Sequence, residues 1–534
     1  SSPKTTEAEN TGHRADCSLI FKAMEDEMAH VCHELATRHN TVPLFVNYVL
    51  ERKHISETES SGGVCVNKRD SGIKNNIAAH IFLGDSLMTS DTGNELNAQS
   101  IPDEIGYGSI RNALRTKSEI AYQDAVQRLD YKRTQLKQNP KPADNAAVPE
   151  FKRMPPAVWI GPSALTNPCP VTDMEQLSNR LSKVFSSYPE LFNHCVKVYQ
   201  KRVDYYRLTS EGQKILQPDT VFHITARASI KTDGNEVKTE YYRLHVGGIN
   251  DLPSEDALIG ELHQFAQYMR QKSQAKAVED LYIGPVLYED DAAMELLAEK
   301  IADYSHSYWI SIRNQSDRKH RYLGKQVFPP ALSVCQLGND SVYNGVKLLG
   351  YRQVDADGTK PKTLPIIEKG ILKHMLTGRT PSLGCPASTG NEHFDGLSRT
   401  LETRYTAGVF RVTSNRPVPY SKLYKRFLKA AKKAGLEHTY IIRKNRTSPY
   451  ALIRVDLSTG KEELVEGNYN SPSREQFKRM HAISKEENVY NLDPAGGKGL
   501  GIISPKAILL EDMELDITPN HARHIDEAFY ELRH

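Results

Sequence analysis

Residues 222–246 read FHITARASIKTDGNEVKTEYYRLHV and carry the strongest strand signal in the chain. Apolar and polar residues alternate through the first part of this segment, which is the period of a half-buried strand. Asp233 and Gly234 then supply residues that tight hairpin turns prefer, and a second strand-like run follows at 237–246. The segment therefore predicts an antiparallel hairpin.

Helical patterns lie on both sides of this hairpin. Apolar residues fall on one face with a period of 3.6 residues from Leu19 onward, and a long amphipathic pattern covers 112–138. A further helix is predicted at 254–275. Strand-like runs at 42–50 and 77–83 complete the N-terminal half. Helices mixed with antiparallel strands predict the α+β class.

The chain is long enough for several domains, since 534 residues exceed the usual domain of about 150 residues. Residues 1–16 are polar and predict a disordered lead-in. The mixed α/β N-terminal region is expected at 17–280, with a proline-rich linker at 139–156 as a possible internal boundary. A strand-rich domain, resembling a β-barrel or a β-sandwich, is expected at 281–534.

Composition narrows the functional classes. Hydrophobic residues make up 39% of the chain and the net charge is +3, so no global charge points to nucleic acid or an anionic membrane. The seven cysteines include no CxxC pair, and no stretch approaches the about 18 apolar residues of a membrane span. The chain begins with Ser1 rather than Met, which favours an exported or periplasmic protein after signal-peptide removal over a cytoplasmic one.

One basic segment, 422–446, stands out against this even charge. It holds nine lysines and arginines against a single acid, Glu437. Such a segment can contact an anionic partner. The competing interpretation is the polar face of an amphipathic helix whose other face carries apolar residues. These residues are Leu423, Phe427, Leu428 and Ala431.

The run from Gly284 to Glu299 is the most informative for function. It reads GPVLYE and, after two aspartates, AAMELLAE. This order resembles the start of the C-terminal domain of the TldD/PmbA family, the zinc-peptidase-related proteins once called modulators of DNA gyrase. Further stretches are similar in order and spacing, and the resemblance covers most of the chain from about residue 17. They are LLGYR at 348–352, DADG at 355–358, the run 367–376, STGN at 388–391 and the run 501–516.

The family's zinc ligands are not matched in this chain. Active members carry an HExxxH helix with two histidine ligands and a glutamate base, plus a distal cysteine ligand. The resemblance places Ala298 and Asp303 at the histidines, Glu299 at the glutamate and Gly496 at the cysteine. A catalytic zinc needs three protein ligands, and alanine and glycine have no donor atom. The resemblance therefore implies no zinc cofactor, no confident catalytic residue and closeness to the PmbA-like members, which also lack the ligands.

The helix predicted at 289–304 has a second, structural interpretation. An apolar stripe would face the core, and Glu299 would then be a solvent-facing glutamate on an amphipathic helix. The stripe comprises Ala292, Ala293, Leu296, Leu297, Ile301 and Tyr304.

Three functional hypotheses follow. The first is a metal-free homologue that binds peptides, or that pairs as a homodimer or as a heterodimer with a TldD-like paralogue, without nucleic acid. The second is an active metallopeptidase with shifted ligands, for instance Asp303, His306 and a distant histidine. The third is anion or nucleic-acid binding through 422–446. These hypotheses differ on whether the chain is an enzyme.

Overall fold

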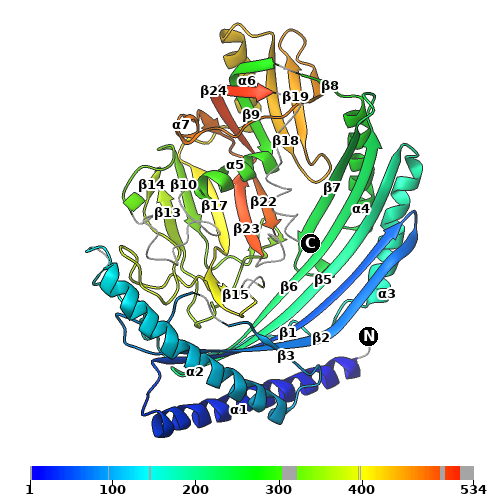
Figure 1. Ribbon diagram of the computed structural model, residues 1–534. Coiled ribbons are helices and arrows are strands. Elements are labelled where there is room, and N and C mark those ends of the chain that lie inside the picture. The colour runs from blue at the N-terminus through cyan, green and yellow to red at the C-terminus, as the bar shows by residue number, and fades with distance from the viewer. Residues whose placement is uncertain are drawn as a thin grey trace.

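The computed structural model describes residues 3–517 apart from 94–95, 144–145, 279, 303–320, 395, 397–398 and 493–498. Figure 1 shows a long curved sheet from the N-terminal half along one side of a C-terminal half that is built on two further sheets. The α+β class predicted from the sequence is confirmed. None of the described helices is long and apolar enough to cross a membrane.

The curved N-terminal sheet has seven strands in the order β3-β2-β1-β5-β6-β4, with β7 paired to β6. The predicted hairpin is confirmed, because β6 and β7 are antiparallel and Phe222 lies opposite Val246. The strands are β1 (Phe45–Ser61), β2 (Val64–Phe82), β3 (Gln99–Ile101), β4 (Ala157–Ile160), β5 (Leu191–Thr209), β6 (Gln213–Lys231) and β7 (Val237–Val246).

Helices cover the outer face of this sheet. Helices α1 (Pro3–Arg38) and α2 (Tyr107–Gln138) lie across one end, and α3 (Val171–Ser182) and α4 (Glu255–Ser273) pack near the other. Short 3₁₀ turns follow α3 and precede α4, at Lys183–Ser187 and Ile249–Asp251. Helix α1 begins at Pro3, so it includes most of the segment expected as a disordered lead-in. Asp16, at the end of that segment, pairs its carboxylate with Arg52 of β1 at 3.2 Å.

The proline-rich segment 139–156 is irregular backbone where it is described, and it packs onto the N-terminal sheet. Phe151 is buried, with its ring centroid 5.6 Å from that of Phe45. The Glu150 carboxylate accepts hydrogen bonds from Lys132 at 2.5 Å and Lys141 at 2.7 Å. The segment is therefore a packed connection rather than a free spacer.

The C-terminal half contains a seven-stranded sheet, β21-β24-β9-β18-β19-β20-β8, and a six-stranded sheet, β14-β13-β10-β17-β23-β22. Two small hairpin sheets, β11-β12 and β15-β16, accompany them. The strands are β8 (Lys276–Ala277), β9 (Asp280–Asp290), β10 (Leu332–Gln336), β11 (Val342–Tyr343), β12 (Val346–Lys347), β13 (Leu364–Glu368), β14 (Ile371–Leu372), β15 (Glu392–Phe394), β16 (Thr403–Tyr405), β17 (Val409–Ser414), β18 (His438–Lys444), β19 (Ala451–Asp456), β20 (Glu462–Glu466), β21 (Ala482–Ile483), β22 (Glu487–Leu492), β23 (Leu500–Pro505) and β24 (Ala507–Ile517).

The two large C-terminal sheets share one core, and helix α5 (Asp291–Ala302) packs into it. Helix α6 (Tyr420–Lys433) and the far side of α4 cover the other face of the seven-stranded sheet, and α7 (Arg474–Lys478) is a short peripheral helix. The arrangement is sandwich-like. The described strands form open sheets rather than the closed barrel that was the other expectation.

Alternating side chains of β5 point to opposite faces of the curved sheet. Tyr206 and Leu208 are buried in the core under α1 and α2. Arg207, between them, points the other way and bonds to the C-terminal half at Asp357. This alternation places polar groups of the N-terminal sheet against loops of the C-terminal half.

Candidate functional site

The predicted site residues divide between described and undescribed parts of the chain. Ala298 and Glu299 lie in the second half of α5. Asp303, His306 and Gly496 fall outside the described residues. The structure therefore tests the surroundings of Ala298 and Glu299 alone.

Glu299 is a hydrogen-bonded group. Its two carboxylate oxygens each lie 2.8 Å from the Ser471 hydroxyl, and the Lys300 ammonium lies 3.1 Å away. The Glu299 side chain is 31% exposed, whereas that of Lys300 is buried. The expected solvent-facing glutamate is thus only partly correct, because its oxygens already accept bonds from neighbouring donors.

Tyr288 of β9 lies near this carboxylate from inside the core. Its hydroxyl is buried and has no hydrogen-bond partner among the described residues. Burial raises the pKa of Tyr288, and the charge of Glu299 raises it further. The phenol therefore stays protonated and can donate, but nothing described receives its proton.

The apolar stripe predicted for this helix is confirmed where it is described. Its residues are buried in the core between the two C-terminal sheets. They are Ala292, Ala293, Leu296, Leu297 and Ile301. Tyr304, the last predicted member, lies outside the described residues.

A second group of acids lies at the start of α5. Asp290 has a left-handed φ of 56°, and its carboxylate accepts from Asn488 at 3.1 Å. Loss of solvent contact, then the charges of Glu295 and Asp290, raise the pKa of Asp291 to about 8. Glu295 is neutralised by the Lys444 ammonium at 2.7 Å. A carboxyl with such a pKa can exchange a proton near neutral pH.

The described residues of α5 do not fit a zinc ion. Ala298 offers no donor atom, and Glu299 is bonded to Ser471 and Lys300. Across the described part of the chain, no group of three or more histidines, cysteines, aspartates and glutamates is arranged to hold a metal. No chemistry through zinc is therefore derived from these residues.

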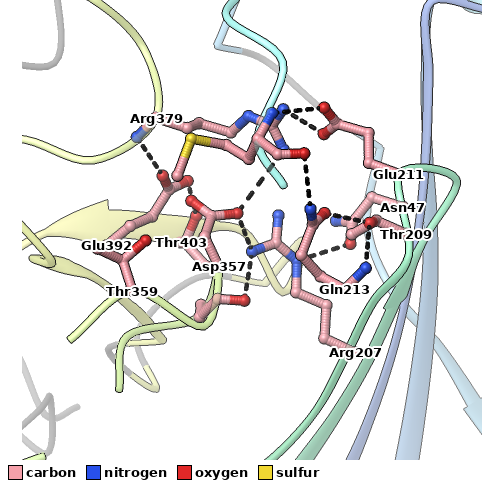
Figure 2. Close-up of polar contacts among 12 residues, drawn as sticks. Asn47, Arg207, Thr209, Glu211, Gln213, Asp357, Thr359, Arg379, Glu392 and Thr403 are labelled. Atoms are coloured by element: carbon pink, nitrogen blue, oxygen red, sulfur yellow. Dashed lines mark hydrogen bonds and ion pairs between the residues drawn. The ribbon is translucent and has the colours of Figure 1, made fainter. Parts of the chain in front are cut away.

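A buried charge network joins the N-terminal sheet to the C-terminal half (Figure 2). We call it the joint, and it consists of Arg207 and Glu211 from the N-terminal sheet region and Asp355, Asp357, Arg379 and Glu392 from the C-terminal half. The sequence identified DADG at 355–358 and STGN at 388–391 only as marks of resemblance. In the structure Asp355 and Asp357 belong to the first stretch, and Glu392 directly follows the second. The fold brings these three acids together.

Asp355 builds the loop that carries the joint. One of its oxygens accepts the backbone N–H of Asp357 and of Thr359, both at 2.9 Å. The other accepts the backbone N–H of Glu392 at 3.2 Å. Gly358 completes the turn with a φ of 79°, which a side chain would strain. Asp355 therefore fixes Asp357 and Glu392 relative to each other.

Arg207 connects β5 to this loop. Its guanidinium donates to Asp357 Oδ1 at 2.9 Å and to the carbonyl of Ala356 at 2.7 Å. Its Nε donates to Asn47 of β1 at 2.8 Å, so two neighbouring strands share the contact. Arg207 and Asp357 are both buried, so water does not compete for this contact.

Arg379 makes the second connection. Its guanidinium pairs with Glu211, in the turn between β5 and β6, and its carbon lies 4.3 Å from the centre of the Phe45 ring. The backbone N–H of Arg379 donates to Glu392 at 3.1 Å, and the Thr403 hydroxyl donates to the other oxygen of Glu392 at 2.6 Å. Arg379 thus links Glu211 of the N-terminal sheet region to Glu392 of the C-terminal half.

The joint holds more buried acids than bases, and this shifts its pKa values. Burial, then the charge of Glu392, raises the pKa of Asp355 to about 7 and that of Asp357 well above its ordinary range. Burial opposes ionisation of Glu392 as well, but the hydrogen bond from Asp357 and the charge of Arg207 lower its pKa to about 2. Asp357 Oδ2 receives no hydrogen bond from the described residues. A neutral Asp357 beside an ionised Glu392 agrees with the opposite pKa shifts of these two groups.

The side-chain amide of Asn391, in the STGN stretch, is the centre of a buried hydrogen-bond network. Asn391 is fully buried, and its amide donates to Gln336 at 2.7 Å and to the carbonyl of Thr406 at 2.9 Å. Its oxygen accepts from Gln336 at 3.0 Å and from Thr389 at 2.8 Å. A buried side chain with every group paired specifies one arrangement of the loops around it.

The basic segment 422–446 contains an amphipathic helix, as its structural interpretation predicted. Leu423, Phe427 and Ala431 of α6 are buried, and Leu428 is partly buried. Beyond the helix the cations are paired. Arg443 bonds to Glu289 at 2.5 Å, Lys444 to Glu295 at 2.7 Å and Arg446 to Glu261 at 2.7 Å.

Comparison with known proteins agrees with these features. Residues 283–417 match the family described as the PmbA/TldA metallopeptidase C-terminal domain. No curated protein gives a significant match to the sequence.

The solved structures that share the fold include the following three. One is a candidate modulator of a DNA gyrase from Thermotoga maritima, with 13% identity, a TM-score of 0.57, and coverage of 92% of this chain and 100% of that one. A second is TldE from Thermococcus kodakarensis, with 10% identity, a TM-score of 0.56, and coverage of 92% and 99%. A third is a candidate modulator of DNA gyrase from Bacteroides thetaiotaomicron, with 12% identity, a TM-score of 0.57, and coverage of 94% and 98%.

The chain is therefore an α+β protein in which residues 283–417 match a metallopeptidase C-terminal domain. At these identities the solved structures establish the shared fold, and the family match covers the segment that contains α5 and most of the joint. The predicted resemblance to the TldD/PmbA family is confirmed.

Proposed function

We propose that this chain is a non-catalytic TldD/PmbA-type protein that binds peptides or acts as a partner subunit, without a zinc ion. The observation that carries the proposal is the second half of α5. Ala298 stands where the resemblance places a zinc ligand, and a methyl group cannot bind a metal. Glu299, at the general-base position, accepts hydrogen bonds from Ser471 and Lys300. The helix is retained for its buried apolar stripe.

Metal content tests this proposal directly. We expect elemental analysis of the purified chain, prepared without chelator, to give far less than one zinc per chain. A variant that restores the ligand types, Ala298→His with Asp303→His and Gly496→Cys, is the matched control for zinc retention during purification. One zinc per unmodified chain would instead support the alternative, an active peptidase with shifted ligands such as Asp303 and His306.

The partner-subunit role receives support from the edge of the N-terminal sheet. Strand β7 pairs with β6 on one side, and no described strand pairs with its other edge. Val237 is 58% and Tyr241 is 40% exposed on this strand. Sheet edges of this length are commonly covered by another element. Light scattering should give about twice 60.1 kDa for a homodimer, or the sum of the two chain masses after mixing with a TldD-like paralogue. A monomer under both conditions would contradict this role.

A second candidate function, anion binding, depends on α6 alone. This 14-residue helix carries six lysines and arginines and no acid, and none of the six forms an ion pair with a described residue. They are Lys422, Lys425, Arg426, Lys429, Lys432 and Lys433. Binding of a single-stranded oligonucleotide should then fall steeply with salt. A binding curve that is flat in salt, or no binding at 50 mM salt, would exclude this function.

A further inference from the structure

The first half of β7 is an open strand edge. It lies at the end of the curved sheet away from α1 and α2 (Figure 1). Val237, Thr239 and Tyr241 are exposed, whereas Tyr242 and Leu244, further along the strand, are buried in the core with α4. No described strand pairs with the outer side of β7. The run 237–241 is therefore the part of this edge that a second strand can reach.

The hydrogen bonds of the β6–β7 hairpin determine which main-chain groups of this run are available. The Thr232 N–H donates to the Glu236 carbonyl at 2.8 Å, and the register of the hairpin places these two residues opposite each other. Along an antiparallel pair, residues that bond to the partner strand alternate with residues that do not. Lys238 and Glu240 therefore bond inward to β6. The remaining residues of the run direct their N–H and C=O groups outward, and no described residue bonds to those groups. They are Val237, Thr239 and Tyr241.

This run is complementary to itself in one register. A two-fold axis places residue i of one copy opposite residue j of the other, and residue j opposite residue i. With the axis at Thr239, that residue lies opposite the partner's Thr239. Val237 then lies opposite the partner's Tyr241, and Lys238 opposite the partner's Glu240. Paired threonines, an aromatic with a β-branched residue, and opposite charges are all favourable across strands. The outward main-chain groups also meet in this register, and they can form about six hydrogen bonds.

The two neighbouring two-fold registers bring like charges together. With the axis at Lys238, that lysine lies opposite itself and Glu240 lies opposite Glu236. With the axis at Glu240, that glutamate lies opposite itself. Like charges directly opposite each other are destabilising. Within one copy Lys238 already pairs with Glu236 at 3.3 Å, and Glu240 pairs with Lys272 at 3.0 Å. The charges therefore select the register, and the main-chain groups and the exposed face supply the attraction.

We propose that two copies of this chain associate by antiparallel pairing of their β7 edges, with the two-fold axis at Thr239. The proposal rests on the partner-subunit role proposed above, and it gives that role to a second copy. An identical copy necessarily repeats the run 237–241, whereas a TldD-like paralogue or an unrelated peptide need not. Five residues a side are fewer than the about 20–30 of a standard interface, so we expect a dimer that dissociates at micromolar concentration.

A cysteine scan of the full chain tests the register. Thr239→Cys places the two thiols on opposed residues whose Cα atoms are about 5.5 Å apart, which is within the range of a disulfide. We expect oxidation to give a disulfide-linked dimer about tenfold or more faster than in Lys238→Cys or Glu240→Cys, on non-reducing gels. The unmodified chain, with its seven cysteines, provides the background. Faster crosslinking through position 238 or 240 would overturn the proposed register.

A proline substitution tests the edge itself. Thr239→Pro removes an N–H that points away from β6, so the hairpin keeps its own hydrogen bonds. We expect dimerisation to weaken by about tenfold or more, because each copy loses a main-chain hydrogen bond. The matched control is Thr239→Val, which loses the same hydroxyl and its bond to Ser229 but keeps the N–H. This control should dimerise as the unmodified chain does. Sedimentation velocity at micromolar concentrations measures the dimer, and urea melts report whether both variants fold.

The outcomes separate this proposal from the partner-subunit role. A dimer that withstands Thr239→Pro would overturn the β7 interface and leave the role intact. A chain that is monomeric alone but pairs with a TldD-like paralogue would do the same. A chain that is monomeric under both conditions would overturn the interface and the role together. If Thr239→Pro fails to fold, the cysteine scan decides alone.

Discussion

The joint and helix α5 are both buried, but they are stabilised in opposite ways. The core-facing stripe of α5 makes apolar contacts, and the polar groups of Glu299 and Ser471 lie at the margin. In the joint, charged groups of both signs are buried together, and each depends on a specific partner. Apolar packing tolerates changes of similar volume, whereas a buried charge without its partner is strongly destabilising. The DADG stretch at 355–358 is therefore part of what joins the two parts of the molecule.

The largest expected effect is at Arg207. Arg207→Met leaves Asp357 and the buried Asn47 oxygen without a donor, so we expect a loss of about 3–5 kcal/mol in unfolding free energy. Denaturant melts measure it. The control is Arg227→Met on the neighbouring strand, whose exposed guanidinium should cost under about 0.5 kcal/mol. Equal losses of unfolding free energy from the two changes would show that the buried contacts of Arg207 stabilise the protein no more than an exposed arginine does.

The next largest loss of stability is expected in the apolar core around α5. Leu297 is 1% exposed in the core between the sheets. Leu297→Ala should cost about 2–5 kcal/mol, whereas Leu297→Met should cost under about 1.5 kcal/mol because volume is kept. The same denaturant melts apply. If Leu297→Met were as harmful as the alanine change, α5 would need a specific shape and not only apolar volume.

A smaller effect is expected from pH, and the direction in which stability changes follows from the pKa shifts of the joint. Asp355 and Asp357 have raised pKa values, so their contribution to stability is lost as pH rises from about 4 through about 7. Glu392 has a lowered pKa, so its contribution is lost only as pH falls from about 4.5 toward about 2. Asp357→Asn keeps an acceptor for Arg207 and a donor for Glu392 without a titrating proton.

We therefore expect Asp357→Asn to flatten the fall in stability between pH 5 and pH 8 by about 1 kcal/mol or more. Glu392→Gln should not flatten it. Urea melts at several pH values provide the measurement. An unchanged slope in Asp357→Asn would show that Asp357 is ionised in the folded protein throughout this range.

The smallest effect is at Ser471. Ser471→Ala removes one hydrogen-bond donor from a carboxylate that is 31% exposed, and water can replace it. We expect a loss of about 0.5–1 kcal/mol, with Glu299→Gln similar in size. A larger loss in either variant would mean that the hydrogen bonds at the margin of α5 stabilise the protein as strongly as the contacts of the joint.

The sequence predicted those elements that are encoded by local periodicity. The hairpin at 222–246 and the buried stripe of α5 were both correct, because alternation and helical spacing reflect burial directly. The lead-in at 1–16 was expected to be disordered because it is polar. Its helix instead gains contacts such as Asp16 with Arg52, which only the folded sheet provides.

The joint was not predicted as a site, for a physical reason. Its residues come from widely separated segments, and Arg207 with Asp357 are 150 positions apart. One signal was available: Arg207 is a charged residue between Tyr206 and Leu208, in a run of β5 that is buried throughout. Alternation along a strand places Arg207 on the face opposite Tyr206 and Leu208, but only the three-dimensional pairing identifies what it faces.

The order of strands in the N-terminal sheet has a consequence for synthesis of the chain. Asn47 of β1 is bonded to Arg207 of β5, which follows it by 160 residues. At about 5–20 residues per second, the ribosome needs about 8–30 s to supply that neighbour. During this delay β1 can pair only with β2, and its other edge is exposed. Glu51, Lys53 and Glu57 are distributed along that edge, where charged side chains disfavour strand-to-strand aggregation of nascent chains.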